Sequence, residues 1–101
     1  MKYKIYYSSD THDDMDGIWH YICVELKNPN AAKRVINKIM ATIKSLAESP
    51  YRGSTLPTRK PTDIKYIQSG NYVIFYKIKD GNVYIGRILY RKRDLVKIVL
   101  E

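Results

Sequence analysis

The sequence is short of several residue types, and each shortage excludes a class of protein. A single cysteine among 101 residues excludes a disulfide framework and gives no sign of secretion. No long apolar run appears, so we expect neither a signal peptide nor a membrane span. Only one Phe and one Trp accompany ten Tyr, so most of the aromatic area carries a hydroxyl that needs a partner or a wet edge. We therefore expect one domain, residues 1–101, in a reducing cytoplasm.

Motifs for familiar chemistry are scarce as well. The sequence contains no Gly-rich phosphate loop, paired catalytic carboxylates or nucleophile motif, so we expect no cofactor. The stretch HDDMD at residues 12–16 gathers one histidine and three aspartates. Acids at the start of a helix are explained by the helix dipole, and no second cluster of ligands occurs elsewhere, so we expect no metal site.

Positive charge is abundant and unevenly placed. The 18 Lys and Arg exceed the 10 Asp and Glu, which gives a net charge of +8. Residues 1–30 hold three basic and five acidic side chains, whereas residues 31–101 hold fifteen and five. Such a chain attracts polyanions or acidic protein surfaces at long range and in a salt-dependent way.

The first half of the chain predicts a strand and a helical hairpin. The opening KYKIYYS alternates and is typical of a strand. Asp10 followed by Asp13 resembles a capping box for a first helix, and Asn28 with Pro29 is a good start for a second. The first helix carries apolar residues at helical spacing at Ile18, Trp19, Ile22 and Leu26. The second carries a stripe of period 3.6 at Ala32, Val35, Ile36, Ile39, Ile43 and Leu46.

Three strands are predicted after the proline-rich loop at residues 50–63. They are IKYIQ, NYVIFYKIK and NVYIGRILYR, and Asp80-Gly81 between the last two is a strong hairpin signal. The order β-α-α-β-β-β predicts a small α+β domain, in which a helical hairpin packs on one face of an antiparallel sheet. Pairing across the hairpin predicts a face toward the helices made of Tyr72, Ile74, Tyr76, Ile78, Val83, Ile85 and Leu89. The opposite face receives Val73, Phe75, Lys77, Tyr84, Gly86, Ile88 and Tyr90.

Arg87 is a separate case. By alternation it falls on the face toward the helices, so we expect it at the rim of that face or in an ion pair.

The basic residues suggest one binding surface. Cations from the loop and from the end of the last strand could converge, namely Arg52, Arg59 and Lys60 with Arg91, Lys92 and Arg93. Interleaved with Tyr51, Tyr84 and Tyr90, they would form a cationic aromatic surface of the kind that grips RNA. The competing interpretation is a solvated edge strand that its charges protect from aggregation.

Nearly the whole chain resembles the RelE/ParE superfamily of plasmid-stabilisation toxins. The resemblance rests on IWHYI, NPNAAKRVINKI and LAESPYRG, and on the final hairpin GNYVIFYKIKDGNVYIGRILYRKRD, in that order. It implies the same β-α-α-β-β-β fold and a toxin that a cognate antitoxin neutralises. A homodimer and a toxin–antitoxin hetero-oligomer are both compatible with it.

The superfamily divides by mechanism. RelE-like members cut mRNA on the ribosome with basic residues and an acid–base group, whereas ParE-like members inhibit DNA gyrase. The resemblance places a phosphate-binding arginine at Arg93, with Lys92 beside it and Tyr90 as the candidate acid–base group. The position where nucleases carry an arginine after the first strand tyrosine is Val73, and the C-terminal tyrosine of RelE aligns near Val99. We therefore favour a ParE-like toxin, with a ribosome-dependent nuclease as the alternative.

Overall fold

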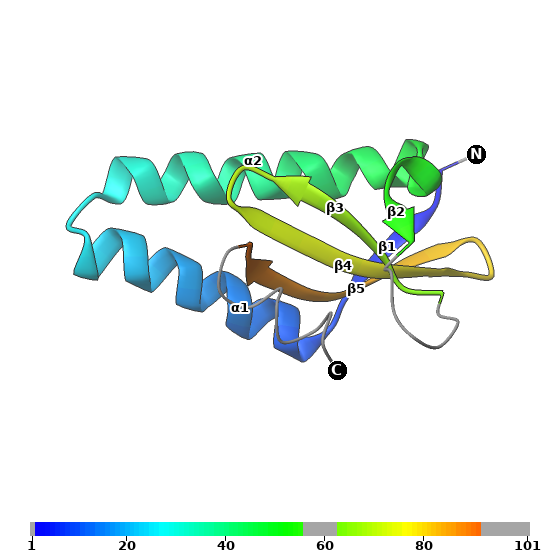
Figure 1. Cartoon of the computed structure of the whole chain (residues 1–101), viewed down its shortest axis with the longest axis horizontal. Coiled ribbons are helices and arrows are strands. Elements are labelled where there is room, and N and C mark those ends of the chain that lie inside the picture. Colours follow the sequence, from blue (N-terminus) through cyan, green and yellow to red (C-terminus); the bar gives the residue numbers. More distant parts are fainter. Residues whose placement is uncertain (1, 56–62, 92–101) are drawn as a thin grey trace.

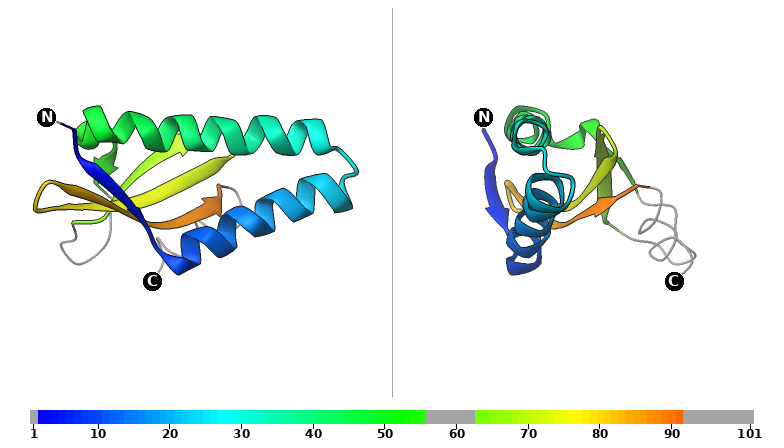
Figure 2. Two further views of the ribbon diagram at one scale, coloured as in Figure 1. Left: turned by 180° about the vertical axis from the view of Figure 1, so that it is seen from behind. Right: turned by 90° about the vertical axis from the view of Figure 1, so that its left-hand side faces the viewer.

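This computed structural model describes residues 2–55 and 63–91. Two antiparallel helices cover one face of a twisted five-stranded sheet (Figures 1 and 2). The helical elements are α1 (Ser9–His20), the π-helical turn η1 (Tyr21–Glu25), α2 (Pro29–Glu48) and the 3₁₀ turn η2 (Pro50–Arg52). The strands are β1 (Lys4–Tyr7), β2 (Ser54–Thr55), β3 (Lys65–Ser69), β4 (Tyr72–Lys79) and β5 (Asn82–Tyr90). The predicted α+β fold with a helical hairpin on one face is confirmed.

The sheet has the order β1-β5-β4-β3-β2, and it is mixed rather than wholly antiparallel. β1 pairs in parallel with β5. The helical hairpin, which follows β1 in the sequence, separates it from the other strands and supplies the long connection that parallel pairing needs. The remaining pairs are antiparallel. β2 adds two residues of strand at the other edge, inside the segment that was predicted as a loop.

Tight turns join β3 to β4 and β4 to β5, and the second is the predicted turn at Asp80-Gly81. At the β4–β5 turn, Asp80 and Gly81 have φ angles of 51° and 76°, which is the arrangement that a type I′ turn requires. At the β3–β4 turn, Gly70 has a φ of 60°, a conformation that glycine adopts without steric penalty.

The start of α1 differs from the prediction. The N-cap is Ser8, two residues before Asp10, and its Oγ accepts a hydrogen bond from Thr11 N at 3.0 Å. Ser8 Oγ also donates to Gly86 O at 2.8 Å, and the buried Thr11 Oγ1 donates to Ile85 O at 3.0 Å. The capping residues of α1 thus bind β5 directly. The second predicted cap is confirmed, since Asn28 Oδ1 accepts from Ala31 N at 3.1 Å and Pro29 opens α2.

The main core lies between α2 and the centre of the sheet. Four residues of the predicted α2 stripe are fully buried, namely Ala32, Ile39, Ile43 and Leu46. They pack with residues of α1, η1, β4 and β5, namely Ile18, Ile22, Ile74, Tyr76, Val83, Ile85 and Ile88. Burial of this apolar area is the main favourable term that holds the hairpin on the sheet.

A β-bulge changes which residues of β5 face the helices. Phe75 pairs with Arg87 and Tyr76 pairs with Ile85, so Gly86 is an extra residue between them. Beyond the bulge the alternation is inverted, because the side-chain period in a strand is two. Ile88 therefore enters the main core, and Leu89 packs on the other face. The prediction was wrong for these two residues, and it was also wrong for Arg87 and Tyr90, which exchange faces with them.

The end of α2 is fastened to the sheet by Tyr76. Its hydroxyl donates to Pro50 O at 2.8 Å and accepts from Gly53 N at 3.1 Å. Burial raises the pKa of this phenol above its ordinary value of 10.0, and the Gly53 N–H and the charge of Arg52 oppose that rise. A Cβ at Gly53 would lie 2.6 Å from Tyr66 O, so only glycine fits there. Among the described residues, no helix is long and apolar enough to span a membrane.

Candidate functional site

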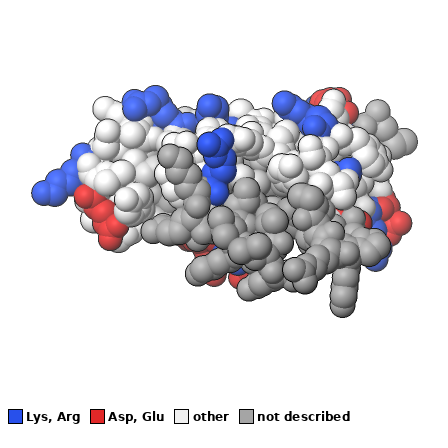
Figure 3. Space-filling model, in the orientation of Figure 1, with Lys and Arg blue, Asp and Glu red and all other residues white. Residues whose placement is uncertain are grey.

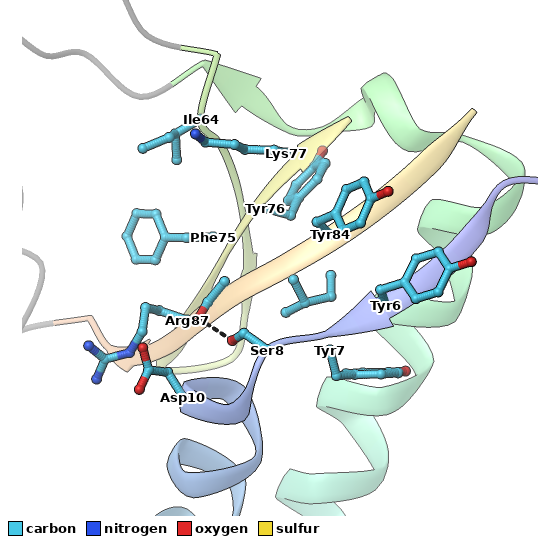
Figure 4. A pocket seen from close by; sticks show the side chains of 12 residues that line it. Tyr6, Tyr7, Ser8, Asp10, Ile64, Phe75, Tyr76, Lys77, Tyr84 and Arg87 are labelled. Carbon is cyan, nitrogen blue, oxygen red and sulfur yellow. Dashed lines mark hydrogen bonds between the residues drawn. The ribbon is translucent and has the colours of Figure 1, made fainter. Parts of the chain in front are cut away.

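A groove of about 420 Å³ opens on the face of the sheet opposite the helices, which we call the open face. Figure 4 shows its lining side chains, which come from β1, the start of α1, β4, β5 and the residue before β3. They are Tyr6, Tyr7, Ser8, Asp10, Ile64, Phe75, Tyr76, Lys77, Tyr84, Ile85, Gly86 and Arg87. The lining is mainly aromatic and aliphatic, with charged groups at its margin.

Two stacked tyrosines form one wall of the groove. Tyr6 of β1 pairs with Tyr84 of β5 across the parallel ladder, and both side chains therefore leave the sheet on the same face. Their ring centroids lie 5.3 Å apart at an interplanar angle of 16°, and the two residues are 46% and 41% exposed. The pair thus presents a large aromatic surface to solvent.

The sheet beneath the open face carries a second, smaller apolar cluster. Val73 and Phe75 of β4 are 3% and 5% exposed, and they pack with Ile64, Tyr66 and Leu89. Val73 pairs with Leu89 across β4 and β5. The position where a nuclease of this fold is expected to carry a cation is therefore a buried aliphatic contact.

The cations that line the groove are ion-paired. Lys77 Nζ lies 3.5 Å from Asp63 Oδ1. Arg87 donates to Asp14 twice, from Nε to Oδ2 at 2.9 Å and from Nη2 to Oδ1 at 3.0 Å. Their charges are thus balanced by neighbouring carboxylates.

Asp14 also binds the edge of β5 beyond the part that pairs with β1. Pairing with β1 ends at Ile85, and Asp14 Oδ2 then accepts the backbone N–H of Ile88 at 2.9 Å. One carboxylate of α1 therefore binds both Arg87 and the strand edge, and it is itself only 13% exposed. The ion pair expected as one option for Arg87 is confirmed.

The described part of the predicted basic surface does not converge. Arg52 donates to Ser45 Oγ at the end of α2. Arg91 lies at the other end of the sheet, where its backbone N–H donates to Asn71 O at 2.8 Å in the β3–β4 turn (Figure 1). The other four predicted cations, Arg59, Lys60, Lys92 and Arg93, lie outside the described residues.

The tyrosines of that predicted surface are also separated. Tyr90 pairs with Tyr72 on the side of the helices, with ring centroids 5.6 Å apart, whereas Tyr84 is on the open face. Tyr51 is 65% exposed, and Lys65 Nζ lies 5.5 Å from its ring centroid. Tyr84 and Tyr90 therefore lie on opposite faces of the sheet.

The acidic stretch at the start of α1 has structural contacts. His12 lies beside Tyr7, with ring centroids 5.9 Å apart. Within residues 2–55 and 63–91, no group of three or more His, Cys, Asp or Glu side chains is arranged to hold a metal ion.

Sequence reasoning missed three parts of the site: the Tyr6–Tyr84 pair, the Ser8 cap and the Asp14 contact with β5. Each joins an N-terminal residue to β5, so each depends on the parallel pairing of β1 with β5. The one local signal was the spacing of Ser8 and Thr11, which is that of a helix N-cap and its N3 residue.

A protein-family model and several solved structures are similar to this chain. The family described as "ParE toxin of type II toxin-antitoxin system, parDE" matches residues 5–95. No curated protein matches the chain. A structure of the chromosomal ParDE system of P. aeruginosa is similar with a TM-score of 0.71 and 18% identity, covering 88% of this chain and 96% of that one. A toxin–antitoxin complex, RelBE2 of Mycobacterium tuberculosis, is similar with a TM-score of 0.66 and 19% identity, covering 90% and 100%.

Proposed function

Because the chain belongs to the ParE toxin family of type II toxin–antitoxin systems, we propose that it inhibits growth by binding a cellular target such as DNA gyrase. The toxin function follows from the family, and the target is the part that we propose. The site we assign to target binding is the groove of the open face. Both gyrase and the ribosome are cytoplasmic, so the toxin is expected to act there.

The observation that carries the binding mechanism is the buried, aliphatic Val73. RNA cleavage needs a base for the 2′-hydroxyl, a cation for the growing phosphate charge and an acid for the leaving oxygen. Val73 supplies no cation, and the described cations of the groove, Lys77 and Arg87, are ion-paired. Because the loss of one charge-stabilising contact typically lowers the rate about 10²–10³-fold, this arrangement favours binding over catalysis.

A cognate antitoxin is the expected protein partner. The two similar structures described above are toxin–antitoxin systems, which supports the same assembly for this chain. The net charge of +8 favours an antitoxin with an acidic toxin-binding segment. Co-purification with the product of the adjacent gene tests this partner directly.

Two assays on the purified toxin decide between the targets. The proposal predicts inhibition of gyrase supercoiling at micromolar toxin, with activity restored when antitoxin is added first. The alternative, a ribosome-dependent nuclease that uses Arg93, Lys92 and Tyr90, predicts codon-phased mRNA cuts in a translation reaction. Under the proposal, neither the wild type nor Arg93→Ala cuts mRNA. The proposal would be refuted if the wild type produced codon-phased cuts that Arg93→Ala did not produce, and if the wild type left gyrase supercoiling unaffected.

A further inference from the structure

One part of the open face combines exposed aromatic rings with lysines in a regular arrangement. Two rows of side chains run across β1, β5 and β4, namely Tyr6, Tyr84 and Lys77 in the first and Lys4, Asn82 and Lys79 in the second. Because alternate residues of a strand share a face, both rows lie on the open face, about 7 Å apart. We call these six residues the tyrosine–lysine platform.

Tyr84 is the central ring of this platform. Tyr6 stacks against it from β1, and β5 lies between β1 and β4, so the second ring face of Tyr84 is directed toward β4. Figure 4 shows the two rings with Lys77 on the neighbouring strand. Gly86 lines the same groove and has no side chain to fill it. The volume of about 420 Å³ is within the usual range of ligand sites, so a planar ring can stack on Tyr84.

The lysines make the platform attractive to anions. Lys4 and Lys79 are exposed, and within residues 2–55 and 63–91 neither forms an ion pair. Lys77 is paired with Asp63, but both side chains are more than half exposed and solvent screens the pair. Asp80 adjoins Lys79 in the turn and is the acid next to this row. Most of the charges visible in Figure 3 are those of Lys and Arg, and the net charge of +8 attracts polyanions from a distance.

We propose that the groove binds single-stranded DNA, with one base stacked on Tyr84 and the backbone phosphates beside Lys4, Lys77 and Lys79. Exposed aromatic rings on a sheet, flanked by cations, are the arrangement that binds single strands, because every base has a face that can stack. The choice of DNA rests on the proposed function, since gyrase acts on DNA. The inference adds that the toxin contacts the nucleic acid itself.

The platform suits a single strand better than other anions. The bases of a duplex are stacked on one another, so a duplex can meet the lysines but cannot place a base on Tyr84. An acidic peptide would likewise use the lysines and leave the ring faces without a planar partner. A second copy of this chain is disfavoured, because it would bring two positively charged molecules together.

The test measures binding of labelled oligonucleotides to the full-length toxin by fluorescence anisotropy. The probes are oligo-dT, oligo-U and a DNA duplex, each about ten nucleotides long, and a glutamate decapeptide. Tyr84→Leu removes the aromatic ring and Tyr84→Phe keeps it. Lys4→Gln/Lys79→Gln removes two platform charges, and Lys33→Gln/Lys44→Gln removes two exposed charges from α2 as the matched control. Circular dichroism and thermal melting show whether each variant is folded.

We expect Tyr84→Leu to bind oligo-dT at least about fivefold more weakly than wild type, and Tyr84→Phe to bind within about twofold. The platform lysine variant should reduce the slope of log K against log salt by about 1.4, and the α2 control should change it less. Oligo-dT should bind more tightly than the duplex and the glutamate peptide, and at least as tightly as oligo-U.

Three results would each overturn the inference. They are equal binding of oligo-dT by Tyr84→Leu and wild type, equal effects of the platform and α2 lysine variants, and a preference of about tenfold or more for oligo-U, which would assign the groove to RNA. The gyrase assay separates this inference from the proposed function. Gyrase inhibition without oligo-dT binding would leave the proposed function standing alone, whereas Tyr84-dependent oligo-dT binding without gyrase inhibition would support the platform and refute the target.

Discussion

Replacing Asp14 tests whether one carboxylate holds α1 against the edge of β5. In Asp14→Ala, the backbone N–H of Ile88 loses its acceptor and Arg87 loses two charge-assisted hydrogen bonds. A partly buried donor without a partner costs about 1–3 kcal/mol. The ion pair adds only about 0.5–1 kcal/mol, because Arg87 is 47% exposed and solvent screens it.

The sum predicts a loss of roughly 1.5–4 kcal/mol in the free energy of unfolding for Asp14→Ala. Arg87→Ala should cost about 1 kcal/mol, because the carboxylate still accepts the N–H of Ile88. Asp14→Asn should fall between them, since its amide oxygen can take that N–H while the charge is lost. Asp16→Ala is the matched control, because Asp16 is an exposed acid of the same helix.

The assay is urea unfolding followed by circular dichroism, for the single variants and for the Asp14→Ala/Arg87→Ala double variant. The double variant should lose less stability than the sum of the two single variants, since Arg87 and Asp14 are in direct contact. At about 1 M NaCl the cost of Arg87→Ala should shrink, while most of the cost of Asp14→Ala should remain. If Asp14→Ala proves no more damaging than Arg87→Ala, the contact with the strand edge does not stabilise the fold and the reasoning is wrong.

Three other outcomes are expected. Gly53→Ala should lower stability by about 2–3 kcal/mol in urea unfolding, because its methyl group meets backbone at Tyr66 O that cannot rotate away. The raised pKa of Tyr76 contributes stability that is full below pH ~10 and is lost as pH rises through the folded-state pKa. The free energy of unfolding should therefore fall less steeply with alkaline pH in Tyr76→Phe than in the wild type. Val73→Arg should lower the free energy of unfolding by about 3 kcal/mol, because it buries a charge between Phe75 and its neighbours. This variant should not cleave mRNA, and codon-phased cuts from it would show that one added cation is enough for nuclease activity.

Local patterns in the sequence predicted most of the fold. The α2 stripe, the Asn28 cap and the Asp80-Gly81 turn each depend on neighbours within a few residues, and each is confirmed. The faces of β5 were correct up to Ile85 and wrong beyond it. Gly86 inside the strand and the charged Arg87 on the face predicted to be apolar were local signs of a bulge, but the position of the extra residue depends on how the two strands pair.

The site was less predictable than the fold, since it is assembled across the whole sequence. Tyr6 and Tyr84 belong to different ends of the chain, and their stacking depends on a parallel register that no local motif encodes. The basic surface was inferred from residue type alone. Charge determines which side chains attract a polyanion, but the strands determine where they lie, and Arg52 and Arg91 lie apart.

The parallel pair of β1 and β5 gives the chain an order of assembly during synthesis. β1 is the first of the described strands to be made, and its partner β5 is the last of them. The contacts of helix α1 with the sheet also cannot form before β5 is made, because its cap and Asp14 bind Ile85, Gly86 and Ile88 of that strand. Contacts this distant in sequence form late and slowly compared with local ones. A growing chain therefore cannot build the Tyr6–Tyr84 wall, so a product truncated before β5 should lack the groove altogether.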